Sequence, residues 1–164
     1  CPVSIQSSLE KFRKHPRTAD NLEVLRRWEE VREKDWLTQE QKQELRNLNQ
    51  EHILLINEQD AFELVPYDRI MNVANGSKEV RAFTFWRNGD LYAVYWHISG
   101  NKKIKLPLSP QNVTLFEDMG KEVSIPDGNK EASVTFPAGR RRFIKTSETK
   151  RELIAAFEKA EILP

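Results

Sequence analysis

Cysteine, long apolar runs and net charge are all scarce in this sequence. A single cysteine, Cys1, excludes an internal disulfide and any metal site that needs several cysteines of one chain. No stretch approaches the roughly 18 consecutive apolar residues that a membrane-spanning helix needs. The 26 basic residues nearly balance the 25 acidic ones, which leaves a formal net charge of +1. We therefore expect no membrane span and no nucleic-acid partner held by a basic field.

Motifs that carry catalysis are also missing. His15, His52 and His97 lie far apart, and none belongs to a pair with the spacing of metal ligands. The sequence contains no nucleophile elbow, P-loop or glycine-rich dinucleotide motif. Cys1 has no neighbour that would activate it as a nucleophile. We predict no catalytic residue, metal or cofactor, and hence no enzyme activity for this chain.

Acidic residues gather in two regions that read as turns. Glycoside hydrolysis needs two opposed carboxylates, about 5–10 Å apart and held on rigid elements. Acids in turns normally serve turn geometry and solvation instead, and we interpret these acids in that way. The residues concerned are Glu58, Asp60, Glu63, Asp68, Glu117, Asp118 and Glu122.

The chain has 164 residues, the length of one ordinary domain. It begins with Cys1 rather than methionine, so we expect it to be processed or to be part of a longer protein. In mature bacterial lipoproteins a cysteine at this position carries the lipid, and a small, polar linker usually follows it. Here Pro2, Val3 and Ile5 follow, which favours a fragment.

The strongest structural signal lies in residues 80–108, which predict three antiparallel strands joined by two tight turns. Asn88 and Gly89 tolerate the positive φ that both central residues of a type I′ turn require. A two-residue loop at this point pairs Phe85 with Tyr92. The first hairpin of the stretch therefore has a defined register.

The second turn, at residues 99–101, suits a three-residue hairpin. Its register places Trp96 opposite Ile104, so that the large apolar residues of all three strands share one core face. That face comprises Phe83, Phe85, Tyr92, Val94, Trp96, Ile98, Ile104, Leu106 and Leu108.

The opposite face of these strands mixes aromatic and polar side chains. Aromatic rings beside hydrogen-bonding groups are typical of sugar-binding surfaces, because the C–H faces of a pyranose pack on rings. The alternative is that helices cover this face, so that its rings only form their docking surface. The candidate ligand-binding residues are Trp86, Tyr95, His97, Lys103 and Lys105.

Two helices are predicted in the N-terminal part of the chain. The first carries an apolar stripe and has Asp20 or Asn21 as its cap. The second begins at Thr38, which forms a capping box with Gln41. Their few apolar residues cannot form a stable core alone, so the pair must dock on another surface. The stripe of the first helix is Leu22, Leu25, Trp28 and Val31.

Strands are predicted from residue 51 onward. Past Leu108 they are short and separated by glycine and proline turns, and this spacing indicates a sandwich or a barrel. A last helix begins at the capping box formed by Thr149 and Glu152. We therefore predict an α+β fold, predominantly an antiparallel β-sandwich with an N-terminal helical hairpin and a C-terminal helix. Residues 1–50 form the arm and helical hairpin, residues 51–164 form the sandwich with its helix, and the two make one compact unit.

Three consecutive arginines, Arg140, Arg141 and Arg142, form the sharpest run of charge. In a strand the first and third side chains share one face and the second lies on the other, so the run makes no continuous cluster. We interpret it as the solvated charge of an edge strand, which discourages pairing with other chains.

Four segments in the C-terminal two thirds follow one another in a characteristic order. They read LYAVYW at 91–96, IKLPL at 104–108, VTLFEDMGKEV at 113–123 and VTFPAGR at 134–140. In pattern and order, residues 80–144 resemble the β-sandwich domain that follows the (β/α)-barrel of many bacterial glycoside hydrolases. No barrel is present in this chain, so no catalytic acid of that family maps onto any of its residues.

The resemblance implies a non-catalytic accessory domain that stabilises or docks on an upstream catalytic domain, in a periplasmic or secreted protein. One alternative is a carbohydrate-binding module that uses the aromatic face with Trp86, Tyr95 and His97. A second alternative is a protein-interaction domain whose helical hairpin recruits a partner. The sugar, the oligomeric state and the compartment are left open by the sequence.

Overall fold

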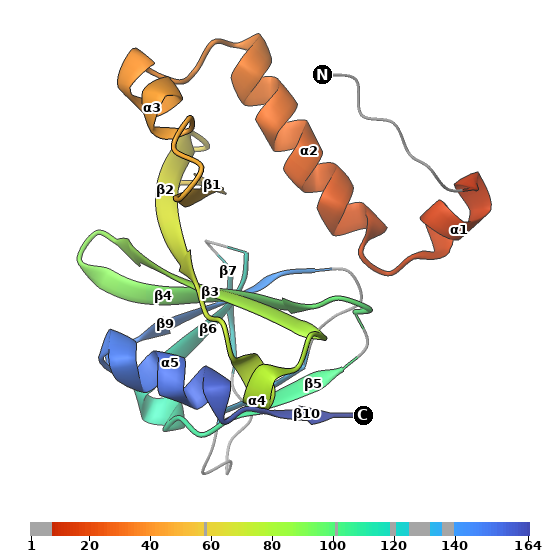
Figure 1. Cartoon of the computed structure of the whole chain (residues 1–164), viewed down its shortest axis with the longest axis vertical. Helices are drawn as coiled ribbons and strands as arrows, with labels where there is room; N and C mark the ends of the chain where they lie inside the picture. Colours follow the sequence, from red (N-terminus) through yellow and green to blue (C-terminus); the bar gives the residue numbers. More distant parts are fainter. Residues whose placement is uncertain (1–7, 58, 101, 119–120, 125–131, 136–139) are drawn as a thin grey trace.

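The computed structural model describes residues 8–57, 59–100, 102–118, 121–124, 132–135 and 140–164. In these residues the chain is α+β, with helices toward its N-terminal end, antiparallel sheets, and a helix near its C-terminal end (Figure 1). The helical segments are α1 (Leu9–Lys14), α2 (Thr18–Glu33), α3 (Gln39–Glu44), α4 (Val73–Gly76), the short 3₁₀ turn η1 (Pro110–Asn112) and α5 (Lys150–Glu158).

The described strands form two antiparallel sheets. Seven of them lie in the order β1-β2-β3-β4-β9-β6-β7, and three form a smaller sheet in the order β10-β5-β8. The strands are β1 (Glu51–Ile56), β2 (Phe62–Arg69), β3 (Val80–Arg87), β4 (Asp90–His97), β5 (Lys103–Leu106), β6 (Val113–Asp118), β7 (Lys121–Val123), β8 (Ala132–Thr135), β9 (Arg142–Thr146) and β10 (Glu161–Leu163).

The hairpin predicted around Asn88 and Gly89 is confirmed. Both residues have positive φ, 51° and 82°, as a type I′ turn requires. Phe85 pairs with Tyr92, in the register that a two-residue loop dictates. This hairpin, β3–β4, lies at the centre of the large sheet.

The second predicted hairpin is wrong. Trp96 does not lie opposite Ile104, because β4 pairs with β9 on its other side and β5 pairs with β10 and β8 in the small sheet. Ile104 and Leu106 instead point from the small sheet into the same cluster as Ala93 and Tyr95. A short strand with alternating apolar residues can bury them in two ways. It can pair with the edge of a sheet, or it can belong to a second sheet that packs on the face of the first. Asn101 lies outside the described residues.

Both faces of the central strands are buried, in two separate clusters. The phenylalanine side of β3 packs with β1, β2 and β9, and this cluster contains Ile53, Leu55, Val65, Phe83, Phe85, Tyr92, Val94 and Phe143. The other side packs beneath α5 and the small sheet, and the two sheets share that cluster, as a sandwich would. The single core face predicted from sequence is therefore divided, since Ile104, Leu106 and Leu108 belong to the second cluster.

The C-terminal helix has the predicted start and the predicted apolar face. Thr149 and Glu152 form a capping box at the beginning of α5. Leu153 and Phe157 are fully buried in the cluster that contains Tyr95, whose ring centroid lies 5.6 Å from that of Phe157. Helix α5 therefore covers the sheet face that carries Tyr95. The sequence had allowed two interpretations of this face, a sugar-binding surface or a docking surface for helices.

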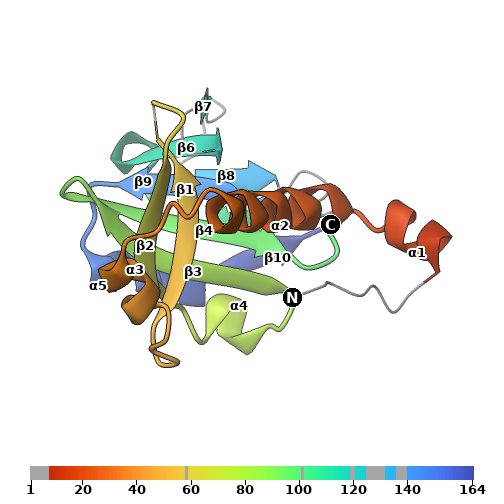
Figure 2. The ribbon, with the colours of Figure 1, turned by 90° about the horizontal axis from the view of Figure 1, so that it is seen from above.

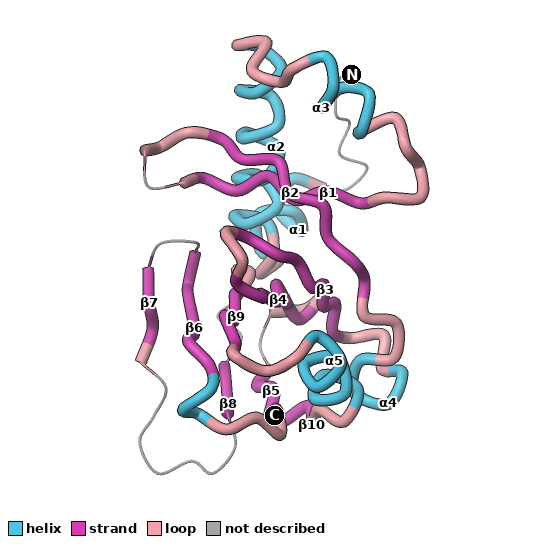
Figure 3. The backbone as a smooth tube through the Cα atoms, turned by 90° about the vertical axis from the view of Figure 1, so that its left-hand side faces the viewer, coloured by secondary structure: helices cyan, strands magenta, loops and turns pink. Residues whose placement is uncertain are grey.

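The N-terminal helices lie on the opposite side of the large sheet. Figures 1 and 3 place α2 on one side of the strands and α5 on the other, and Figure 2 shows α2 crossing over the β1–β2 region. Helix α3 begins with the predicted capping box of Thr38 and Gln41. Helix α2 begins earlier than predicted, with Arg17 at the cap position, so that Asp20 lies inside the first turn.

Truncation of Phe157 tests whether α5 is an integral layer. We expect Phe157→Ala to lower the free energy of unfolding by about 3–5 kcal/mol, because it opens a cavity in a fully buried site. Urea unfolding followed by circular dichroism measures the change. Leu48→Ala is the matched control, since Leu48 is 96% exposed and its loss should change stability by less than about 0.5 kcal/mol. Equal effects of the two substitutions would contradict this role of α5.

Candidate functional site

The structure does not gather the five candidate residues of the sheet face into one surface. Trp86 is 54% exposed and pairs with Leu91 next to the hairpin turn. His97 lies at the other end of β4, six residues and therefore roughly 20 Å from Leu91. Trp86 and His97 are thus too far apart to contact one sugar ring.

Tyr95 is fully buried between the sheet and α5. Burial raises the pKa of its phenol well above the usual value, and the nearby Arg142 charge only partly opposes this effect. Its ring therefore forms part of the core, packed on Phe157, and offers no face to a sugar.

His97 is also buried and organises the turn that follows β4. Its Nδ1 accepts hydrogen bonds from the backbone N–H groups of Ser99 and Gly100, at 3.2 Å each. This arrangement places the ring proton on Nε2, which faces a carboxylate oxygen of Glu79 at 3.5 Å. These contacts fix the course of the chain between β4 and β5.

Lys103 and Lys105 lie on β5, in the small sheet. Lys103 is exposed and Lys105 is half-buried, and both alternate with the buried Ile104 and Leu106. Because the strand does not pair with β4, these lysines do not extend the face that carries Trp86. The helix-covered alternative therefore describes the sheet face better than the sugar platform.

Several of the acidic residues noted in the sequence are ion-paired. Glu63 bonds to Arg87 at 2.9 Å, and Asp68 to Lys150 at 2.6 Å. Glu117 contacts a guanidinium nitrogen at 3.2 Å. Among the described residues no group of three or more histidine, cysteine or acidic side chains is placed to hold a metal ion. Glu58 lies outside the described residues.

The guanidinium that contacts Glu117 belongs to Arg142, the first residue of β9. The position of this strand shows that the interpretation of the arginine run as edge-strand charge is wrong. Strand β9 lies inside the large sheet, between β4 and β6, and is no edge. Arg142 is the only residue of the run that lies in β9, and Arg141, just before the strand, contacts Asp20 of α2. Nothing in the sequence indicated which strands lie beside β9.

Large apolar side chains are exposed on the N-terminal helices and on the segments that follow them. Leu22 on α2 is 46% exposed and Leu9 on α1 is 61% exposed. Others at the same end of the fold are Leu25, Trp36 and Leu48. Leu22 faces outward from α2, whereas Leu25, three residues further on, is partly turned toward the sheet. None of the helices in the described part of the chain is long and apolar enough to span a membrane.

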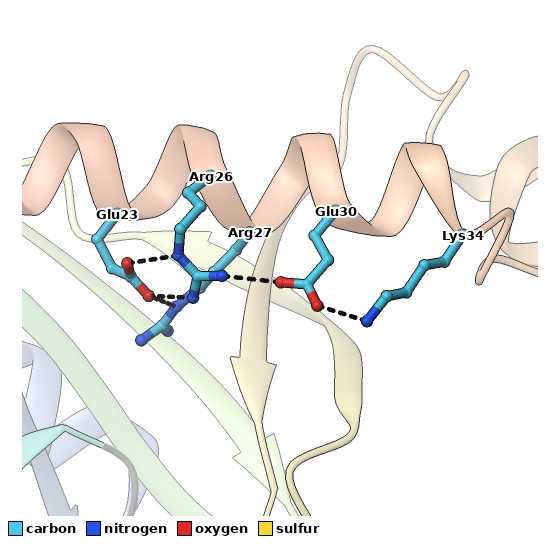
Figure 4. A network of polar contacts seen from close by, with 5 residues as sticks. All are labelled: Glu23, Arg26, Arg27, Glu30 and Lys34. Carbon is cyan, nitrogen blue, oxygen red and sulfur yellow. Dashed lines mark hydrogen bonds and ion pairs between the residues drawn. The ribbon is translucent and has the colours of Figure 1, made fainter.

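Helix α2 is stiffened by a row of ion pairs along one flank (Figure 4). Glu23 accepts hydrogen bonds from the Nε atoms of Arg26 and Arg27, at 2.9 Å each, and Glu30 joins Arg26 to Lys34. The hydrogen bond from Arg26 is the largest influence on Glu23 and lowers the pKa of its carboxyl to about 2, with Arg27 adding to the effect. The outward surface of α2 therefore belongs to a helix that its own ion pairs stabilise.

No known family model matches this chain, and no curated protein or solved structure is similar to it. Over its described residues the fold defines the class of an α+β protein, with a seven-stranded antiparallel sheet between N-terminal helices and a C-terminal helix.

The lowered pKa of Glu23 makes a prediction about acid stability. The ionised carboxylate is favoured in the folded state, so its contribution is complete above the unfolded pKa and is lost as the pH falls through the folded value. We expect wild type to exceed Glu23→Gln in stability at neutral pH by up to about 1 kcal/mol. This difference should disappear between about pH 4.5 and about pH 2.

Urea titrations at a series of pH values measure this difference. The matched control is Glu33→Gln, which removes an exposed acid of the same helix that makes no ion pair within the described residues. A difference between wild type and Glu23→Gln that stays constant from pH 7 to pH 2 would contradict the assignment.

Proposed function

We propose that this chain is a non-catalytic accessory domain of a glycoside hydrolase, and that its N-terminal helices pack against the catalytic domain of the same polypeptide. The observation that carries the proposal is the set of large apolar side chains exposed on these helices, with Leu9 and Leu22 the most prominent on α1 and α2. Clustered exposed apolar side chains are typical of surfaces that bind another protein surface.

The position of these side chains in the fold supports a partner domain within the same polypeptide. A domain that precedes this chain in a longer protein would join it at α1. The described residues of the large sheet already bury both faces of their central strands, so the N-terminal helices offer the best remaining surface. The resemblance of residues 80–144 to a domain that follows a catalytic barrel supports the class of this partner.

A carbohydrate-binding role for the aromatic sheet face has less support. Tyr95 and His97 are buried, and Trp86 remains as a single exposed ring. A single exposed ring gives little affinity or selectivity for a sugar. A protein-interaction role shares the same helices with the proposal, but its partner is a separate chain.

The double substitution Leu9→Asp and Leu22→Asp tests the proposal in the full polypeptide that the gene encodes. We expect it to weaken the packing of the two domains by about 2–4 kcal/mol, since Leu9 and Leu22, both exposed in the isolated chain, would lose an apolar partner. Calorimetry should then show two separate unfolding transitions instead of one, and limited proteolysis should release this domain. Leu25 is kept unchanged because it also faces the sheet side.

Two comparisons make the result specific. In the isolated chain of residues 1–164 the double substitution should change stability little, because both leucines are exposed there. Met71→Asp, which alters an exposed apolar residue next to α4, at the opposite end of the fold from the N-terminal helices (Figure 1), should leave the full polypeptide unchanged. A coding sequence without a catalytic domain upstream, or equal effects of both substitutions, would overturn the proposal. Binding of a separate protein through Leu22 alone would favour the interaction role.

A further inference from the structure

Helix α2 does not pack tightly on the large sheet but encloses a cavity of about 410 Å³. This volume lies within the range of small-molecule sites, roughly 300–1,000 Å³. Asn21 and Leu25 line the cavity and are themselves exposed, so it opens to solvent beside α2. It is separate from the outward surface that carries Leu9 and Leu22.

Aromatic rings form the sheet side of this cavity. Tyr67 on β2 and Trp96 on β4 line it, and both rings pack on Phe83 of β3 between them. The ring centroids lie 4.3 Å apart for Tyr67 and Phe83, and 5.5 Å apart for Phe83 and Trp96. Trp28 of α2 lines the helix side. Tyr67 and Trp96, linked through Phe83, thus form the aromatic floor of the cavity.

One end of the cavity is closed by a buried group of charges. Asp20 lies between two arginines, at 2.5 Å from Nη2 of Arg17 and 3.4 Å from Nε of Arg141. The three side chains are only 8–11% exposed. Because one carboxylate faces two guanidinium groups, the group carries an excess positive charge in a place that water reaches poorly.

Arg17 has the capacity to bind more than Asp20. Its side chain lies over the Trp96 ring, with the guanidinium carbon 5.5 Å from the ring centroid, and its Nη1 has no hydrogen-bond partner within the described residues. Burial lowers the pKa of this guanidinium, and the neighbouring positive charge of Arg141 also lowers it. The carboxylate of Asp20 has the opposite effect and raises it. A buried guanidinium with an unused donor is costly unless an anion completes its coordination.

We propose that this cavity binds a sugar ring that carries a carboxylate, such as a uronic acid. The sugar ring packs its C–H face on Tyr67, because the Trp96 ring already has the Arg17 guanidinium over it and stacks on Phe83. The carboxylate accepts charge-assisted hydrogen bonds from the unused donor of Arg17 and from the guanidinium of Arg141. Asp20, Asn21 and His52 line the same cavity and are the partners for the ring hydroxyls.

The lining favours this ligand over two simpler anions. A phosphate dianion would bring two negative charges close to the buried Asp20 carboxylate, at a high electrostatic cost. A small carboxylate such as acetate would satisfy Arg17 but leave the aromatic floor and the hydroxyl partners unused. The proposal does not depend on docking to a catalytic domain, because the two surfaces lie on different sides of α2.

Tryptophan fluorescence gives a direct test, because the four tryptophans divide into two pairs. Trp28 and Trp96 line the cavity, whereas Trp36 and Trp86 are exposed elsewhere. In a Trp36→Phe, Trp86→Phe background, titration with sodium glucuronate should produce a saturable change in emission. Glucose and sodium acetate, at the same ionic strength, should bind at least tenfold more weakly.

Variants of the charged end locate the carboxylate. Arg17→Met, which keeps an apolar stem over Trp96, and Arg141→Gln should each weaken glucuronate binding at least tenfold. Arg26→Gln removes an exposed arginine from the same helix and should leave binding unchanged. The Leu9→Asp, Leu22→Asp variant should also bind normally, which separates this test from that of domain docking.

Three results would overturn the assignment. The absence of a saturable change in emission with glucuronate would contradict the existence of the binding site. Equal affinity for glucose would exclude the role of the arginines, and equal affinity for acetate would exclude the sugar ring. Should Arg17→Met fail to fold, as judged by its circular dichroism, the Arg141→Gln variant and the ligand comparison on the parent protein still decide the matter.

Discussion

The burial of both faces of the β3–β4 hairpin is the constraint on which the rest of the structure depends. Both of its faces carry mostly apolar side chains, so each face needs a cover that removes it from water. Helix α5 and the small sheet cover the side with Ala93 and Tyr95. Strands β1 and β2, with α2 beyond them, cover the side with Phe83 and Phe85. The order of the layers follows from this requirement.

The two covers differ in their chemistry. The α5 side is an apolar core, in which Leu153 and Phe157 are fully buried. The α2 side buries only one apolar residue of the helix, Val31, together with the charged Asp20 and Arg27. Dense apolar packing leaves no room for a ligand, whereas charged side chains around a cavity require partners. A bound ligand would therefore stabilise the α2 side more than the α5 side.

Helix α2 consequently presents two different surfaces. Its inward side holds the Arg17, Asp20 and Arg141 group above an aromatic floor, and its outward side carries Leu22. Its ion pairs run along a third flank and stiffen the helix between these surfaces. An accessory domain that docks through one side and binds a sugar acid through the other would use a single helix for both purposes.

Local chemistry let the sequence determine several elements by itself. The Asn88–Gly89 turn, the register of β3 and β4, and the capping boxes of α3 and α5 all depend on residues close together in the chain. The apolar face of α5 also follows from its spacing alone. These features are decided by backbone geometry and short-range hydrogen bonds, which neighbouring residues specify.

Only the tertiary structure decided which surfaces meet. The alternating apolar residues of β5 fit a place beside β4 as well as a place in a second sheet, and long-range packing selected the latter. The sheet face with Tyr95 read as half polar, yet α5 buries it. The sequence indicated Asp20 as a helix cap. In the structure Asp20 belongs to a buried charge group, because it contacts Arg141, which lies 121 residues further along the chain. Such pairings depend on where distant segments pack, which local sequence patterns do not specify.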